Sequence, residues 1–248
     1  MNALLAELLK AATTRLLLWF GLGLLAFLLL VLSIHIGSSD VQHLSELSGQ
    51  RSVFELAGLA SIVAVLVGSV LVTAEYAHGT INQSFLAVPV RERLLLAKLA
   101  AVVLVVFAIA VLTDVATLLI AELWYQGRGL TLHLGSDTMT PFLGAVGASM
   151  LAAAIGFGIG ATLRRQTGSI VVILLWLLIG EGVISAVGDA ARFAPGHVLG
   201  AVVAANAEGS RDVLGVWSAT FVGLVYAVGF CAAGFLAVLG SDVPSSGD

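Results

Sequence analysis

Residues 16–36 of the chain read LLLWFGLGLLAFLLLVLSIHI, an apolar run of 21 residues without Asp, Glu, Lys or Arg. A helix of about 20 apolar residues is long enough to cross the hydrocarbon core of a bilayer, which is about 30 Å thick. The apolar part of a cleavable signal peptide is shorter, at roughly 7–15 residues. The run therefore predicts a transmembrane helix and not a signal peptide.

The composition extends this prediction to the whole chain. Of the 248 residues, 59% are hydrophobic and 10% are charged, and the mean hydropathy is +1.08. A soluble domain carries about 25% charged residues, so most of this surface must face lipid. We predict an all-α integral membrane protein with one six-span domain over residues 1–240. Residues 241–248 are expected to form a short polar cytoplasmic tail.

Six apolar runs are long enough to span a bilayer. They are Leu16–Ile36, Val53–Ala74, Leu99–Ala121, Pro141–Leu163, Ser169–Val187 and Val213–Leu239. The four prolines, at 89, 141, 195 and 244, fall at or between the ends of these runs. Because lipid cannot replace the backbone hydrogen bond that a proline removes, this spacing favours unbroken helices.

Basic residues predict the orientation of the spans, because Lys and Arg gather on the cytoplasmic side. With the amino terminus inside, the inner set is Lys10, Arg15, Arg91, Arg93, Lys98, Arg164 and Arg165, and the outer set is Arg51, Arg128, Arg192 and Arg211. We expect a multi-pass protein of the cell membrane with both termini cytoplasmic. Residues Met1–Thr14 form either an interfacial helix or an extension of the first span.

The loop after the second span, EYAHGTINQSFLAVPVRER at 75–93, is too regular in pattern for a passive linker. Gly79 permits a sharp turn where the chain leaves the membrane. Thr80 and Gln83 have the spacing of a capping box, which would start a helix at Ile81.

One side of this short helix is apolar. Ile81, Phe85 and Val88 share a face at spacings of four and three, and Pro89 ends the helix. The pattern predicts a two-turn amphipathic helix on the cytoplasmic side. Such a helix can rest on lipid headgroups or dock on a partner.

Several motifs of the chain resemble the permease subunits of ABC-2 type ABC transporters. They are Glu-Tyr-x-His-Gly-Thr at 75–80, Leu-Ala-x-Pro-x-Arg at 86–91, Ala-Lys-Leu at 97–99, AELLKAATTR at 6–15 and Phe-Ala-Pro-Gly-His at 193–197. The six-span layout is also similar to that of the family.

The resemblance implies that Ile81–Val88 is a coupling helix, which docks on a separate ATP-binding subunit. It implies a role for Glu75 in linking this helix to the gate. It further implies two permease copies, identical or paralogous, in an exporter of drugs, antibiotics, peptides or lipids. The sequence has no G-x-x-x-x-G-K-[ST] phosphate loop. We therefore expect no catalysis and no cofactor on this chain, with ATP and Mg²⁺ bound by the partner.

Two carboxylates lie deep within the predicted spans, Asp114 and Glu181. Because a charge in lipid is costly, such residues face protein or a wet cavity. They either line a substrate pathway or make structural hydrogen bonds, for instance from Thr113 or Thr117 to Asp114.

The fourth span carries a small residue at every fourth position. These residues are Gly144, Ala148, Ala152, Gly156 and Gly160. Small residues allow helix backbones to approach closely in lipid. The stripe predicts either helix packing within the chain or a dimer seam.

Two other function classes compete with the exporter permease. In an ion-gradient-driven transporter or channel, Asp114 and Glu181 would be ion sites, but no inverted repeat is visible. In an intramembrane serine protease, Ser149 would need a histidine base, and no later span contains one. The histidines show no metal-site spacing, so no metal is expected.

Overall fold

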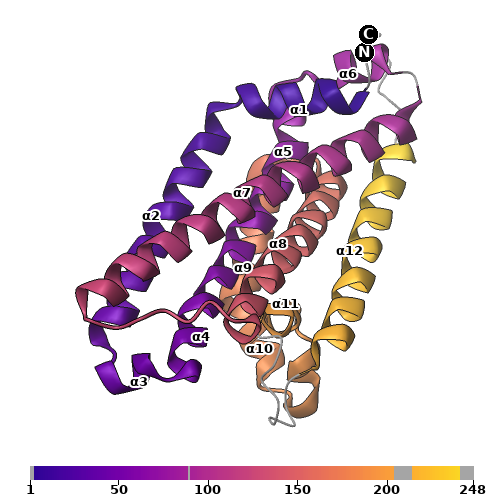
Figure 1. Ribbon diagram of the computed structural model, residues 1–248. Helices are drawn as coiled ribbons and strands as arrows, with labels where there is room; N and C mark the ends of the chain where they lie inside the picture. The colour runs from indigo at the N-terminus through magenta and orange to yellow at the C-terminus, as the bar shows by residue number, and fades with distance from the viewer. Residues whose placement is uncertain (1–2, 89, 204–213, 241–248) are drawn as a thin grey trace.

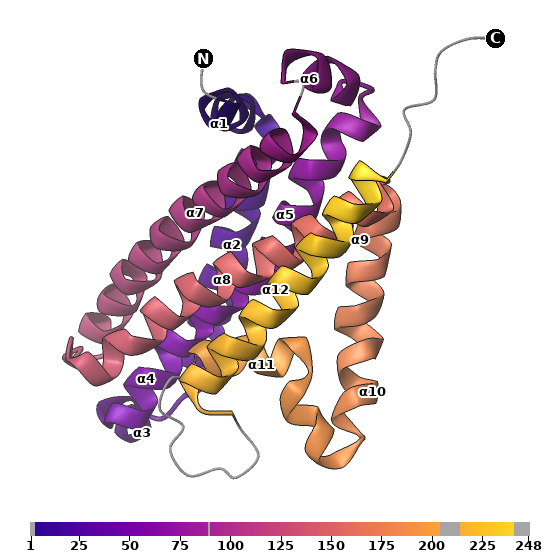
Figure 2. The ribbon, with the colours of Figure 1, turned by 90° about the vertical axis from the view of Figure 1, so that its right-hand side faces the viewer.

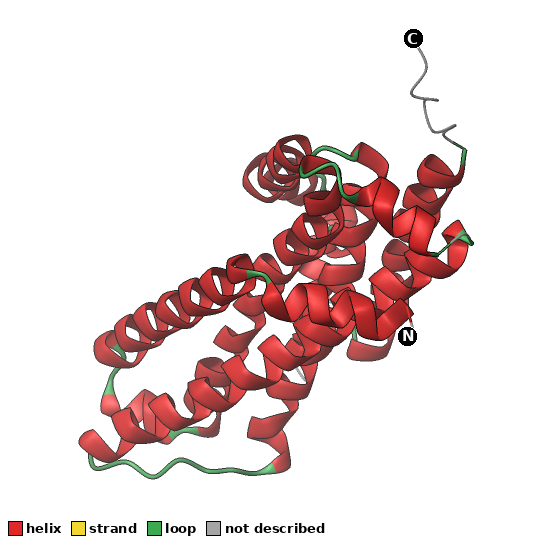
Figure 3. Cartoon of the chain, turned by 90° about the horizontal axis from the view of Figure 1, so that it is seen from above, coloured by secondary structure: helices red, strands yellow, loops and turns green. Residues whose placement is uncertain are grey.

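The computed structural model describes residues 3–88, 90–203 and 214–240, and these residues form helices joined by short loops without any strand (Figure 3). The α-helices are α1 (Ala3–Thr13), α2 (Arg15–Ser38), α3 (Val41–Ser45), α4 (Leu47–Glu55), α5 (Ala60–Ala77), α6 (Ile81–Ala87), α7 (Arg91–Gly127), α8 (Ser136–Leu163), α9 (Gln166–Leu175), α10 (Glu181–Ser185), α11 (Pro195–Val203) and α12 (Val216–Leu239). Tight 3-10 turns cover Leu56–Leu59 and Gly188–Phe193.

Within the described residues, six helical segments are long and apolar enough to cross a membrane. They are Leu17–Ser38, Leu47–Ala77, Arg91–Gly127, Thr138–Leu163, Gln166–Ser185 and Val216–Leu239. The all-α, six-span prediction is therefore confirmed. The third segment has 37 residues, many more than the predicted run Leu99–Ala121, because hydropathy detects only the apolar part of a helix that continues at both ends.

The long helices run side by side, with α8 in the middle of the bundle (Figures 1 and 2). Helices α1 and α6 and the last turn of α12 lie at one end, called here the α6 end; α3, α4 and α11 lie at the other, the α3 end. Helix α1 crosses the α6 end, and Thr14 separates it from α2 with an extended backbone (φ −83°, ψ 109°). This separation favours an interfacial helix over an extension of the first span.

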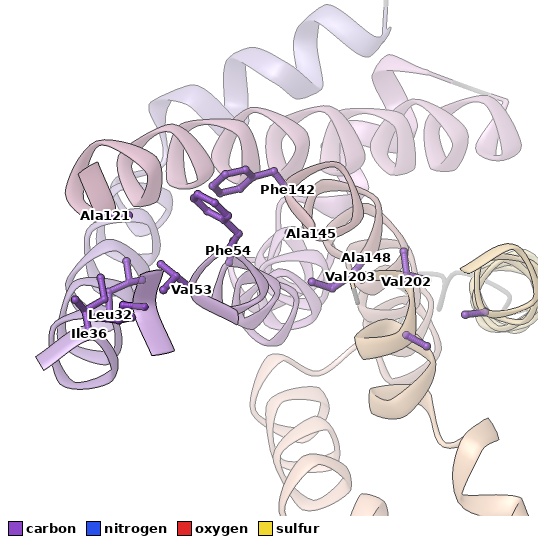
Figure 4. Close-up of a cluster of buried hydrophobic side chains, with 14 of the residues drawn as sticks. Leu32, Ile36, Val53, Phe54, Ala121, Phe142, Ala145, Ala148, Val202 and Val203 are labelled. Atoms are coloured by element: carbon purple, nitrogen blue, oxygen red, sulfur yellow. The ribbon is translucent and has the colours of Figure 1, made fainter. Parts of the chain in front are cut away.

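The larger apolar core lies toward the α3 end and joins α2, α4, α7, α8, α11 and α12 (Figure 4). Its centre is the ring pair Phe54–Phe142, whose centroids are 4.7 Å apart. A second core around Phe157 and Leu95 packs α5, α7, α8 and α12 together nearer the α6 end. Both cores contain residues of α8, so this helix is the axis of the fold.

The stripe of small residues on α8 packs against helices of the same chain. A Cβ atom on Gly144 would lie 2.4 Å from the Val202 carbonyl oxygen of α11, and one on Gly156 would lie 1.9 Å from the Val65 carbonyl oxygen of α5. Ala148 and Ala152, between them, are fully buried, and a Cβ on Gly160 would lie 2.6 Å from Val72 Cγ1. The structure thus places the stripe in helix packing inside the chain, not on an outer seam.

We expect Gly156→Ala to destabilise the fold, because its new methyl group would overlap the backbone of α5. Overpacking of this kind costs about 1–3 kcal/mol. The matched control is Gly21→Ala in α2, where a Cβ meets nothing within 4 Å and alanine favours the helix by up to about 1 kcal/mol. Thermal unfolding of both detergent-purified variants checks this. Equal melting temperatures would contradict the close contact.

Two details differ from the expectation of regular, unbroken helices. The fifth span is continuous, but residues Trp176–Gly180 form a π-helical segment between α9 and α10. Helix α8 begins at Ser136, so Pro141 lies inside the helix near its start. Neither difference interrupts a span, because the backbone stays helical on both sides.

Candidate functional site

A cluster of charged side chains joins three helices at the α6 end. Lys98 of α7 is only 4% exposed, and its ammonium group donates to Glu7 Oε2 of α1 at 2.6 Å and to Glu75 Oε1 of α5 at 2.5 Å. Buried charges persist only when they are paired and hydrogen-bonded. Lys98 is therefore the centre of a charge cluster that fastens α1 and α5 to α7.

A second lysine extends this charge cluster to α6. The Lys10 ammonium group donates to Glu7 at 2.6 Å, to Glu75 at 2.9 Å and to Ser84 Oγ at 3.0 Å, and the Ser84 hydroxyl donates to Glu75 Oε2 at 2.9 Å. Burial alone would lower the pKa of Lys10, but the hydrogen bonds to Glu7 and Glu75 outweigh it and hold this pKa above its ordinary value. Two carboxylates thus balance two ammonium groups.

The turn before α6 is built differently from the prediction. Gly79 has a φ of +67°, as the predicted sharp turn requires. The predicted capping box is wrong, because the Thr80 side chain makes no capping hydrogen bond. The backbone N–H of Thr80 instead donates to the Glu75 carbonyl at 2.9 Å. The end of α5 therefore fixes the start of α6.

Helix α6 turns its aromatic residue toward its own chain. Phe85 packs against the second core, and the Arg91 guanidinium carbon lies 5.4 Å from its ring centre. Ile81 and Val88 are half-buried, whereas Leu86 is 84% exposed. Of the face predicted for docking, Phe85 therefore packs on the bundle, whereas Val88 lies just past the end of α6 with an extended backbone. Leu86 is the large apolar side chain that α6 presents outward. Pro89 lies outside the described residues.

The described part of the chain also contains a large cavity of about 880 Å³. Its walls come from α5, α8, α9–α11 and α12, and Glu181 is among its lining residues. Aromatic side chains contribute from three sides. They are Trp176, Phe193, Tyr226 and Phe230. Volumes of roughly 300–1,000 Å³ are typical of sites for small molecules, so this cavity is the second candidate site.

Two neutral donors hold the Glu181 carboxylate in place. Its Oε1 accepts hydrogen bonds from the Trp176 indole N–H at 2.7 Å and from the Gly196 backbone N–H at 2.8 Å. The π-helical segment explains the first bond, because residues five apart stack in a π-turn. Oε2 has no hydrogen-bond partner among the described residues. Its nearest basic atom is Nδ1 of the half-exposed His197, at 3.5 Å.

The model of the ABC-2 family transporter protein matches residues 3–180, which include the charge cluster, α6 and most of the spans. The chain belongs to the ABC-2 transporter family. It is therefore a multi-pass membrane permease of ABC transporters, a transport component without catalysis of its own. No curated protein matches the chain.

The two carboxylates that the sequence grouped together lie in different places in this ABC-2 permease. Asp114 is 8% exposed on α7 and does not line the large cavity, whereas Glu181 does. Neither carboxylate oxygen of Asp114 has a hydrogen-bond partner among the described residues. The expected bonds from Thr113 and Thr117 are both absent. The Thr113 hydroxyl donates to the Ile109 and Ala110 carbonyls, and the Thr117 hydroxyl has no partner among the described residues.

Sequence reasoning assigned no contact to Glu7, Lys10 or Ser84 of this permease. It used Lys10 and Lys98 only to orient the spans and as parts of the family motifs. One signal was available. Glu7 and Lys10 stand at helical spacing in an otherwise apolar stretch, a pattern that favours an ion pair. Lys10 contacts Glu75, which is 65 positions away in the sequence, and Glu7 contacts Lys98, which is 91 positions away. A local sequence pattern could not reveal contacts between residues so far apart.

Proposed function

We propose that this chain is the membrane-spanning subunit of an ATP-driven exporter, and that a separate ATP-binding subunit docks on α6. The observation that carries the proposal is the charge cluster, in which Ser84 of α6 is hydrogen-bonded to Glu75 and Lys10. A force applied to α6 would reach α1, α5 and α7 directly through these contacts. Family membership supports association with an ATP-binding subunit.

In this mechanism the partner binds ATP and Mg²⁺, and closure of two partner subunits moves α6 of two permease copies. Leu86, exposed at the tip of α6, enters a groove on the partner. Glu75 and Lys98 carry the movement to α5 and α7, whose shift changes access to the space between the copies. The chain itself supplies no catalytic group to ATP hydrolysis.

This proposal places the chain in the cell membrane with the α6 end in the cytoplasm. Reporter fusions after residues 88 and 166 should then read as inside, and fusions after residues 50 and 133 as outside, because six spans put α1, α6 and the end of α12 on one side. Alkaline phosphatase fusions are active when the fusion site lies outside, and green fluorescent protein fusions fluoresce when it lies inside. A reversed result at any two sites would overturn this orientation.

One observation favours a second candidate, an ion-gradient-driven transporter. Asp114 is buried in the third span with both carboxylate oxygens unpartnered among the described residues, and carboxylates inside membranes often carry protons or ions. In such a transporter Asp114→Asn would abolish transport that needs no nucleotide.

Inside-out vesicles that contain the chain, with and without its ATP-binding subunit, distinguish the two candidates. We expect substrate uptake to need both the subunit and hydrolysable ATP, and to continue when an uncoupler removes the proton gradient. Uptake by the chain alone under a proton gradient would overturn the proposal in favour of the gradient-driven transporter.

A further inference from the structure

The chemistry of the large cavity indicates what it can hold. Most of the residues that line it are aliphatic, aromatic or glycine. The few lining residues with a carboxylate or hydroxyl group are Glu55, Ser61, Glu181 and Tyr226. A volume of about 880 Å³ fits an organic molecule of drug size. The occupant must therefore have a largely apolar body.

The charges at the cavity are of one sign. Among the residues that line it, two are acidic and none is Lys, Arg or His. Glu55 is compensated, because its Oε1 lies 3.0 Å from Arg51 Nε. Glu181 accepts its hydrogen bonds from two neutral groups, which hold its negative charge in place without cancelling it. The basic atom beside it is Nδ1 of His197, which lies 3.5 Å from Oε2 on a half-exposed side chain outside the lining of the cavity. An anion would meet repulsion here, whereas a cation would be attracted in a medium of low dielectric constant.

Aromatic rings add a second cation-selective element. Trp176 and Glu181 belong to one wall, and Tyr226 and Phe230 come from α12. The ring of Phe193 already has the Arg192 guanidinium carbon 5.1 Å from its centre, so the other three rings are the ones open to a ligand. The Tyr226 hydroxyl donates to the Phe193 carbonyl at 2.7 Å, which ties two of these walls together. Ring faces attract cations, most strongly where water is excluded. The rings can therefore bind both the apolar body and the charge of one ligand.

The position of the carboxylate depends on a glycine. A Cβ atom on Gly196 would lie 2.9 Å from both Cδ and Oε2 of Glu181, so any larger residue at this position would push the carboxylate away. Together with the π-helical segment that aligns Trp176, this close approach holds Glu181 ready before a ligand arrives. Pre-positioned groups of this kind lower the cost of binding.

We infer that the cavity binds amphiphilic organic cations, with an apolar aromatic body among the rings and the positive charge beside Glu181. If the chain is an exporter subunit, as proposed above, these cations are its substrate class. The inference rests on that proposed function only in this respect. Binding itself is a property of this chain and can be measured without ATP or a partner.

The test uses two probes of matched shape and opposite charge, tetraphenylphosphonium and tetraphenylborate. Equilibrium dialysis of each labelled probe against the purified chain in lipid nanodiscs gives its Kd. We expect saturable binding of the phosphonium, at least about tenfold tighter than that of the borate. Glu181→Gln should weaken phosphonium binding by about tenfold or more. The fold should survive this change, because the glutamine carbonyl can still accept from Trp176 and Gly196.

Glu122→Gln is the matched control, because this carboxylate lies on α7 outside the cavity and bonds Gln126. It should leave the Kd of the phosphonium unchanged, whereas Gly196→Ala should raise that Kd by displacing Glu181. Absence of saturable phosphonium binding, equal binding of the borate, or an unchanged Kd in Glu181→Gln would each overturn the inference. A chain that binds the phosphonium as expected but transports without ATP would refute the proposed function alone.

Discussion

Lys98→Met is expected to remove most of the folded protein. Lys98 and Lys10 both contact Glu7 and Glu75, but of the two lysines Lys98 is the one that is almost fully buried. Its loss leaves two neighbouring carboxylates with one ammonium group, and removal of one partner of a buried pair costs about 3–5 kcal/mol. A decrease of this size in the free energy of unfolding approaches the total free energy of unfolding of many domains. Monodisperse yield by size-exclusion chromatography and thermal unfolding measure the effect.

Two comparison variants separate charge imbalance from a simple packing defect. Lys10→Met should cost less, because the Lys10 side chain is 48% exposed and water screens the remaining charges. The double variant Glu7→Leu with Lys98→Met leaves the Lys10–Glu75 pair neutral overall. It should therefore be more stable than the sum of its single variants predicts. Additive losses would contradict the view that these four charges act as one unit.

Leu86→Ala is expected to weaken binding of the ATP-binding subunit while the permease itself stays folded. Leu86 is 84% exposed and makes up the apolar tip of α6, so its truncation removes few contacts that stabilise the fold of the chain. Burying a leucine side chain at an interface is worth about 1.5–3 kcal/mol, which corresponds to roughly a tenfold or greater loss of affinity. Co-purification of the partner and ATP hydrolysis stimulated by substrate measure the outcome.

Leu143→Ala is the control, since Leu143 is the same residue type and 78% exposed but lies in the first turns of α8, toward the α3 end. It should change neither measurement. Phe85→Ala should lower both the stability of the chain and the coupling, because Phe85 packs against the second core and Arg91. Coupling that survives in Leu86→Ala but fails in Phe85→Ala, without loss of stability, would assign docking to Phe85 instead.

The fold was predictable because hydropathy depends on local composition. Each apolar run corresponds to a span in the structure, and even the short helix at Ile81 begins where Gly79 and Thr80 predict it. The reason given for that start was wrong, because a capping box is one of several ways to satisfy the first turn. Sequence alone could not choose between the Thr80 side chain and the Glu75 carbonyl.

The candidate sites were predictable only in part. The family motif points to Glu75, and the position of Glu181 within a span indicates that it needs a partner or a cavity. The structure gives Glu75 a charge cluster and Glu181 a cavity. Their partners come from helices far away in the chain. Which face of α6 is exposed likewise depends on packing against the bundle, which helical spacing does not encode.

The length of α7 gives this permease a lever arm. A helix of 37 residues is about 56 Å long at 1.5 Å per residue, nearly twice the thickness of the hydrocarbon core. Its interior contains neither proline nor glycine, so it has no built-in point of bending. If α7 pivots about Lys98, a tilt of about 5° would displace the far end at Tyr125 by about 3–4 Å over the intervening 27 residues of helix. In the proposed mechanism, a small push on one side of the membrane would thereby become a movement wider than a water molecule on the other.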